Sequence, residues 1–290
     1  MMAGVGLAQT PVRPAITGIA FVQVYSADAA ASQAFYGGVL GYDHADPNHL
    51  DRYTVNEAQW VEVTALPSPA PKTRIATIGF TTRDAAKLEK YLRAHGVAIE
   101  QPLYAGRFGI HDPEGRLVVF VQQGPARTPG TAQLSPGAAS HRIIHTGFTV
   151  QDRDVEDKFY KDLLGFKPYW YGGRTEGSLD YVSLQVPDGT DWVEYMLRST
   201  PQVDARQLGS DNHLSLGVAH IDEAMAAAKL GCKDPGCRMD AATHVGRNGA
   251  TQFNLYDPDM TRVEYMEFDP VKEPCCSPYT GPHPKEKEDR

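Results

Sequence analysis

The sequence contains no apolar run that approaches the roughly 20 residues needed to cross a bilayer, so no membrane span is expected. It also lacks an excess of basic residues. The formal net charge is -8, which repels polyanions and removes the attraction that dominates nucleic-acid binding. Neither a membrane nor a nucleic acid is therefore an expected partner. We expect a small-molecule partner, and the chain could be a monomer or a homodimer.

Cysteine is scarce and is confined to the last fifth of the chain, at Cys232, Cys237, Cys275 and Cys276. The even number permits one or two disulfides, whereas the spacings fit no standard zinc knuckle. Segment 1–14 is small and apolar but lacks the basic start of an export signal, so it is either a trimmed signal or a frayed terminus. These features favour an exported, periplasmic protein, and a cytoplasmic one stays open.

The chain repeats itself. SADAAASQAFYGGVLGY (Ser26–Tyr42) and VQDRDVEDKFYKDLLGF (Val150–Phe166) share an acidic residue, a helical stretch, Phe-Tyr, an aliphatic pair and Gly-aromatic. A second pair, Gly79–Val97 and Gly217–Lys233, places a strand ahead of an acidic cap and a short amphipathic helix. Alternating strands follow each helix. The pattern predicts an α+β protein built from four βαβββ units.

The boundaries follow from composition. A Pro, Gly, Ser and Ala-rich stretch without apolar period marks a linker at 125–138, between predicted domains at 15–124 and 139–269. The remaining residues, 270–290, are rich in Pro, Lys and Glu. We expect them to form an irregular tail.

The repeated motifs resemble those of the vicinal oxygen chelate superfamily, which contains glyoxalases, bleomycin resistance proteins and extradiol dioxygenases. The resemblance is carried by FYGGVLGY and FYKDLLGF, by the turns HDPEGRLVVF and YDPDMTRVEY, and by the four-unit repeat. It implies that two βαβββ units form one domain with a cupped mixed sheet, so the chain would hold two tandem domains. It also implies that a metal ion can bind in the cup.

In this superfamily the metal ligands come from the first and last strands of each unit. The corresponding positions in the second half carry nitrogen and oxygen donors, namely His145, Glu194, His213 and Glu264. The matching positions in the first half are mostly unable to bind metal, namely Phe21, Glu62, Ile75 and Val119. The resemblance thus predicts one divalent ion (Zn, Ni, Co, Mn or Fe(II)) in the second domain, no organic cofactor, and a metal-free first domain.

A set of two histidines and two glutamates resembles that of glyoxalase I, in which a carboxylate moves a proton between adjacent carbons. Glu264 or Glu194 would then be the base of an isomerase or lyase. The alternative enzyme is a type I extradiol dioxygenase, with His145, His213 and Glu264 holding Fe(II). Its signature is broken here, because Asn254 occupies the tyrosine position and His244 is one residue out of place. The third alternative is a non-catalytic binding or resistance protein.

Further residues are candidates for the site. His244, a candidate acid or base, and Arg247 belong to the glycine-containing loop HVGRNGA, which could close over the metal. Further candidates for the pocket lining are Tyr171, Arg174, Trp192 and Met196. His244 and Arg247 could equally be ordinary solvent-exposed loop residues without a role in the site. Core packing explains Trp192 and Met196 equally well.

Overall fold

The computed structural model describes residues 12–44, 51–124, 135–197, 204–234 and 236–286. Most of the expected N-terminal segment and of the expected linker lies outside these residues. In the part of the chain that is described, no helix is long and apolar enough to span a membrane.

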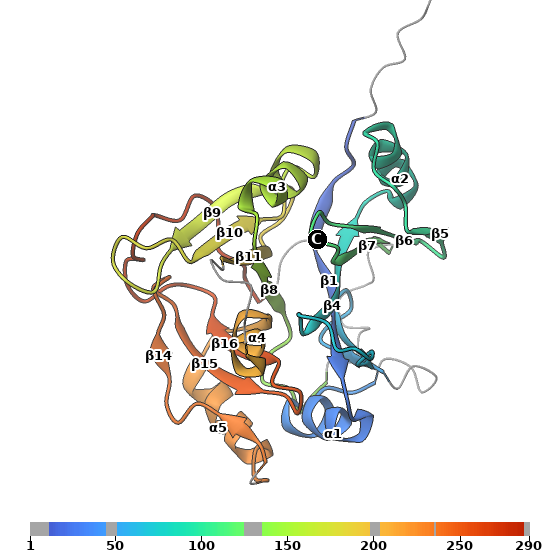
Figure 1. The fold of residues 1–290 in the computed structure, drawn as a ribbon. Coiled ribbons are helices and arrows are strands. Elements are labelled where there is room, and N and C mark those ends of the chain that lie inside the picture. Colours follow the sequence, from blue (N-terminus) through green and yellow to red (C-terminus); the bar gives the residue numbers. More distant parts are fainter. Residues whose placement is uncertain (1–11, 45–50, 125–134, 198–203, 235, 287–290) are drawn as a thin grey trace, which may run out of the picture.

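Each half of the chain builds one sheet (Figure 1). The first sheet has the strand order β2-β3-β1-β4-β7-β6-β5. Its strands are β1 (Ile16–Ser26), β2 (Arg52–Thr54), β3 (Trp60–Ala65), β4 (Ile75–Thr82), β5 (Gln101–Tyr104), β6 (Arg107–His111) and β7 (Leu117–Gln122). Its helices are α1 (Ala29–Gln33), which continues as the π-helical η1 (Ala34–Val39), and α2 (Ala85–Ala94).

The second sheet repeats this arrangement with the order β13-β15-β16-β12-β8-β11-β10-β9, and β14 pairs with β15. Its strands are β8 (Ile143–Val150), β9 (Lys167–Gly172), β10 (Tyr181–Gln185), β11 (Trp192–Leu197), β12 (His213–Val218), β13 (Arg238–Met239), β14 (His244–Val245), β15 (Thr251–Tyr256) and β16 (Arg262–Glu267). Its helices are α3 (Arg153–Asp157), the π-helical η2 (Lys158–Leu163), α4 (Ala205–Asp211) and α5 (Ile221–Gly231).

The predicted α+β class and the repeated units are confirmed, because each half pairs two units through a central antiparallel pair, β1 with β4 and β8 with β12. Acidic N-caps begin three of the repeated helices: Asp28, Asp84 and Asp152 each accept backbone N–H bonds. The prediction of an acidic cap for the fourth helix was wrong. His220 precedes α5 without a side-chain cap, and the acidic residues lie in the first turn.

The two halves interlock through the same motifs that carry the repeat. The Tyr36 hydroxyl donates to Asp257 Oδ2 in the second half (3.0 Å), and the Tyr160 hydroxyl donates to Asp112 Oδ2 in the first half (3.4 Å). All four side chains are buried. The Phe-Tyr motif of one half therefore contacts the Asp-Pro turn of the other, and one apolar core runs through both halves.

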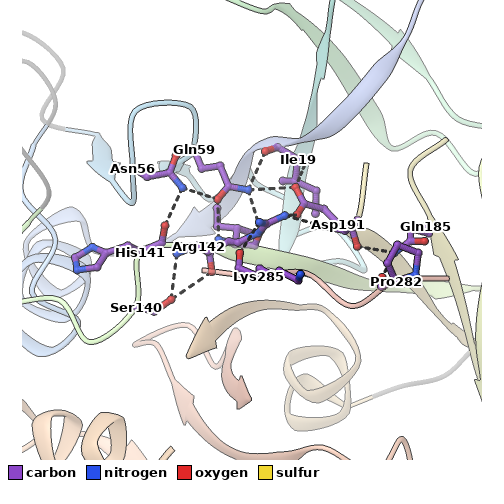
Figure 2. Close-up of polar contacts among 12 residues, drawn as sticks. Ile19, Asn56, Gln59, Ser140, His141, Arg142, Gln185, Asp191, Pro282 and Lys285 are labelled. Carbon is purple, nitrogen blue, oxygen red and sulfur yellow. Dashed lines mark hydrogen bonds and ion pairs between the residues drawn. The ribbon is translucent and has the colours of Figure 1, made fainter. Parts of the chain in front are cut away.

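A polar network fixes the edge where the halves meet (Figure 2). Gln59 donates to the carbonyls of Ile19 (3.0 Å) and Ile143 (2.8 Å), one in each half. The buried Arg142 forms an ion pair with Asp191, and the amide of Ile19 donates to the same carboxylate at 2.8 Å. Because these bonds join Ile19 and Gln59 of the first half to Arg142, Ile143 and Asp191 of the second, the two sheets are held in one relative position.

The tail, expected to be irregular, has no helix or strand between residues 270 and 286, but it is bonded along the second sheet. The amide of Thr280 donates to the Tyr169 carbonyl (3.0 Å), and the Ser277 hydroxyl exchanges bonds with the backbone of Tyr171 on β9. Arg142 donates to the carbonyl of Lys285 at 2.6 Å. Two disulfides are present, Cys232–Cys237 and Cys275–Cys276.

Candidate metal centre

The predicted ligands lie on four strands, and the sheet register brings them to one face. His145 on β8 is opposite Ser215 of β12, and Ser215 is also opposite Glu264 of β16. Gly147, two residues beyond His145, is opposite both Glu194 of β11 and His213 of β12. Because paired residues and residues two apart share a face, all four side chains point to the same side of the sheet.

The absence of a side chain at Gly147 leaves room for the imidazole of His213. A Cβ atom built on Gly147 would lie 1.9 Å from Cε1 of His213, so any side chain there would displace the imidazole. The residue is therefore part of the site although it offers no ligand atom. Trp192 supports the other imidazole, since its ring stacks on His145 with centroids 4.5 Å apart.

The donor atoms converge. His145 Nε2 lies 3.1 Å from His213 Nε2 and 3.2 Å from Glu264 Oε2, and His213 Nε2 lies 3.5 Å from Glu194 Oε2. One donor atom from each of His145, Glu194 and His213 lies within 4.8 Å of the other two. Glu264 approaches from the side of His145. Glu194, at 14% side-chain exposure, is the most accessible of the four.

Burial and neighbouring charges set the protonation of these groups. Burial, followed by the positive charge of Arg262, lowers the pKa of His213 to about 4. Burial alone would raise the pKa of Glu264, but the bond with His145 and the nearby Arg262 outweigh it and hold the pKa well below its usual range. The pKa of Glu194 is lowered as well: burial raises it, but the bond with His213 and the charges of His145 and His213 together outweigh burial. A neutral imidazole and ionised carboxylates are the ligating forms.

This donor set fits a divalent cation. Two imidazole nitrogens that face each other at 3.1 Å, flanked by two carboxylates, form the mixture of ligands that Zn, Fe, Mn, Ni and Co accept. His145 Nδ1, on the far side of the ring, is buried without a hydrogen-bond partner among the described residues. The structure supports a His/Glu metal site and leaves the identity of the metal open.

The first half fills the same place with other groups. The register shows that Thr77, not Ile75 as expected, is the counterpart of His213, because Thr77 is opposite Gln23 as His213 is opposite Gly147. The counterparts are thus Phe21, Glu62, Thr77 and Val119. Glu62 is bound by two guanidinium groups, from Arg52 at 2.9 Å and Arg107 at 3.5 Å.

The tail covers the cup of the second half. Tyr279 packs with Trp192, Met266 and Tyr169 in one apolar cluster, and its hydroxyl donates to the carbonyl of Asn248 (2.9 Å). Met196, expected to line the pocket, is buried. The apolar cover reduces the access of water to the ligand cluster. No local signal predicts this cover, because the tail has no periodic pattern.

The other predicted site residues are placed apart from the ligands. Tyr171 and Arg247 line a surface pocket of about 510 Å³ together with Cys275 and Cys276. Arg174 forms ion pairs with Asp180 (3.4 Å) and Asp211 (3.6 Å). His244 is half exposed, with Nδ1 3.9 Å from Asp240 Oδ2 and Nε2 facing the amide of Gln252. Its described contacts do not include the four donors.

One residue of the cluster was missed. Arg262 is opposite His213 in the sheet, and its Nη2 donates to His213 Nδ1 at 2.8 Å while Nη1 lies 3.6 Å from Glu264 Oε1. The sequence held a usable signal, since Arg262 precedes Glu264 by two residues on a strand and must share its face.

The glyoxalase/bleomycin resistance protein/dioxygenase superfamily model matches residues 18–120 and 142–265, one segment in each half. The chain belongs to this superfamily. No curated protein sequence matches it significantly.

Solved structures of dioxygenases have a similar fold over nearly the whole of this chain. The 2,3-dioxygenase LapB from Pseudomonas sp. KL28 is similar with a TM-score of 0.65 at 16% identity, over 94% of this chain and 96% of that one. A catechol 2,3-dioxygenase gives 0.65 at 15% identity, over 95% and 96%. Homoprotocatechuate 2,3-dioxygenase from Brevibacterium fuscum, solved with 3,4-dihydroxyphenylacetate, gives 0.62 at 18% identity, over 96% and 86%. At these identities the likeness shows the fold.

Proposed function

We propose that the protein is a divalent-metal-dependent enzyme acting on a small substrate with two adjacent oxygen atoms. His145, Glu194, His213 and Glu264 would hold the ion. The observation that carries the proposal is the convergence of His145, Glu194 and His213, with the two Nε2 atoms 3.1 Å apart and Glu264 Oε2 3.2 Å from His145 Nε2. When bound, a divalent ion supplies a Lewis acid that polarises the substrate oxygens and stabilises developing negative charge.

We infer that the reaction is a proton transfer of the isomerase or lyase type, with Glu194 as the base. Glu264 is tied to His145 at 3.2 Å and lies beside Arg262, whereas the contacts of Glu194 are longer, 3.5 Å to His213 and 3.4 Å from the Ser183 hydroxyl. Glu194 is also the more exposed carboxylate. It is therefore the carboxylate better able to approach a substrate carbon and return the proton.

The surroundings suit such a reaction. Trp192, Tyr169 and Tyr279 place aromatic rings over the cup, and Met266 completes the apolar side. In a site that excludes water, the charges of the carboxylates act on the substrate with less screening.

A second candidate is ring-cleaving dioxygenase chemistry, and the similarity to three such enzymes over nearly the whole chain favours it. His145, His213 and Glu264 would then hold Fe(II). Two observations speak against this candidate. Asn254 stands where the dioxygenase signature has tyrosine and donates to Asp240, and the described contacts of His244 are with Asp240 and Gln252.

Two assays on the metal-loaded protein separate these reactions. If the reaction is proton transfer, solvent deuterium should enter an α-hydroxy ketone such as dihydroxyacetone. NMR under anaerobic conditions measures this exchange. Glu194→Gln should lower this exchange by about 100-fold or more, because general-base catalysis contributes about 10²–10⁴. Glu62→Gln, its counterpart in the first half, is the matched control and should leave the exchange unchanged.

The opposite result is oxygen uptake with catechol after anaerobic Fe(II) loading. If the wild type consumes oxygen and Glu194→Gln consumes it equally fast, ring cleavage replaces proton transfer as the function.

A further inference from the structure

Arg262 occupies the far side of one predicted ligand. Its Nη2 lies 2.8 Å from His213 Nδ1, and its Nη1 lies 3.6 Å from Glu264 Oε1. One guanidinium group therefore faces two of the four donors. The register equivalent in the first half is Leu117, opposite Thr77, so the arrangement belongs to the second half alone.

The contact fixes the protonation of the imidazole. A guanidinium carries only donors, so His213 Nδ1 must accept through its lone pair. In a neutral imidazole the proton is then on Nε2, the atom that points at His145. A protonated Nε2 cannot ligate a metal.

Metal binding through Nε2 requires the other tautomer. Ligating histidines normally donate the N–H on the far side of the ring to an acceptor, and Arg262 offers none. For His213 to ligate, the proton must move through solvent from Nε2 to Nδ1, and Arg262 must leave Nδ1. The Arg262 side chain as a whole is 14% exposed, so part of the residue that has to move is in contact with solvent.

We propose that Arg262 is an internal competitor of the metal: its guanidinium stabilises the metal-free protein by binding His213 and facing Glu264, and the ion binds only when it displaces that group. This inference rests on the proposed metal site and adds its regulation. Arg262 is a positioning residue that sets metal affinity, and it is not a ligand.

A series of substitutions at position 262 tests the proposal through metal affinity. Arg262→Gln removes the charge and offers a carbonyl oxygen to Nδ1–H, so the dissociation constant for Zn²⁺, measured by competition with a chromophoric chelator, should fall by about 10- to 100-fold. Arg262→Met is neutral but offers no acceptor, so its dissociation constant for Zn²⁺ should lie between those of Arg262→Gln and the wild type. Arg262→Lys keeps a cationic donor, so its dissociation constant for Zn²⁺ should stay near that of the wild type.

A matched control comes from the first half. Arg107 lies 3.5 Å from Glu62, much as Arg262 lies 3.6 Å from Glu264, and Arg107→Gln should leave Zn²⁺ affinity unchanged. A second readout is independent of affinity: ¹⁵N NMR of the metal-free protein should find the His213 proton on Nε2 in wild type and on Nδ1 in Arg262→Gln.

The outcomes separate this inference from the metal site itself. If wild type binds Zn²⁺ and Arg262→Gln binds it equally well or more weakly, the competitor role is wrong while the site stands. If neither wild type nor Arg262→Gln binds Zn²⁺, both the competitor role and the site are wrong. A proton on Nδ1 in the metal-free wild type would also overturn the competitor role.

Discussion

The double variant His145→Ala/His213→Ala is expected to lose its divalent metal, with a dissociation constant at least about 1000-fold weaker than that of the wild type. The reason is that both nitrogen donors are removed; for scale, metal binding in zinc-finger peptides is worth about 10–16 kcal/mol. Elemental analysis after dialysis measures the loss directly.

Thermal unfolding gives a second measure of the same change. A ligand present at about 1000 times its dissociation constant stabilises a folded protein by about 4 kcal/mol. Added metal should raise the melting temperature of the wild type and leave the double variant unchanged. Because Glu264 loses its partner in the variant, each metal-loaded protein is compared with its own metal-free form.

The matched control is His111→Ala/His220→Ala, which removes two exposed histidines outside the cup. It should keep both the bound metal and the thermal shift. Metal retained by the cup variant and lost by this control would place the ion elsewhere in the chain.

The second large effect concerns a buried acid far from the ligands. Glu156 on α3 is fully buried, its Oε1 accepts from the amide of Glu114 at 3.1 Å, and its Oε2 has no partner among the described residues. Burial, followed by the negative charge of Asp112, raises the pKa of Glu156 from 4.5 to about 8. The folded protein therefore holds this proton more tightly than the unfolded chain.

A raised pKa means that the stabilising contribution is complete below about pH 4.5 and is lost as the pH rises through about 8. Glu156→Gln cannot ionise, so it should be more stable than the wild type at pH 9, by an amount on the order of 3 kcal/mol. The two proteins should be similar near pH 5. Urea unfolding at both pH values measures the difference.

Asp257 also has a raised pKa, about 7, mainly through burial, so the wild-type profile alone would mix the two groups. The difference between wild type and variant isolates Glu156. Glu176→Gln, at an exposed carboxyl, is the control and should follow the wild type. A Glu156→Gln protein that loses stability with rising pH as steeply as the wild type would contradict the assignment.

The sequence was sufficient for the repeat and the fold class, and the family resemblance named the second-half donors that the sheet register brings to one face. Helix caps, the Phe-Tyr motifs and the Asp-Pro turns are local signals, and they recur in each half. Strand alternation alone then places residues such as His145 and Gly147 on one face.

The register of the first half was not accessible in this way. Aligning Gly79 with Gly217 made Ile75 the counterpart of His213. The two glycines are not equivalent, however, because different side chains pack against them. A Cβ on Gly79 would meet the Phe21 ring at 2.1 Å, whereas one on Gly217 would meet the Phe268 ring at 2.3 Å. Hydrogen bonds to the adjacent strand, including a register shift after Gln23, decide the pairing.

Contacts between distant segments were also beyond local reasoning. The bond from Tyr36 to Asp257 joins the halves, and the tail covers the cup through backbone bonds that need no sequence pattern. Arg262 was missed for a different reason. A positively charged side chain repels a metal ion, so an arginine was not expected beside residues predicted to bind one.

The most direct test of the metal site is anomalous diffraction from crystals soaked in Co²⁺, with data collected on both sides of the cobalt edge. We expect one strong anomalous peak per chain within bonding distance of His145 Nε2 and His213 Nε2, bounded by the carboxylates of Glu194 and Glu264. A peak only at other residues, or imidazoles that point apart in the soaked crystal, would contradict it.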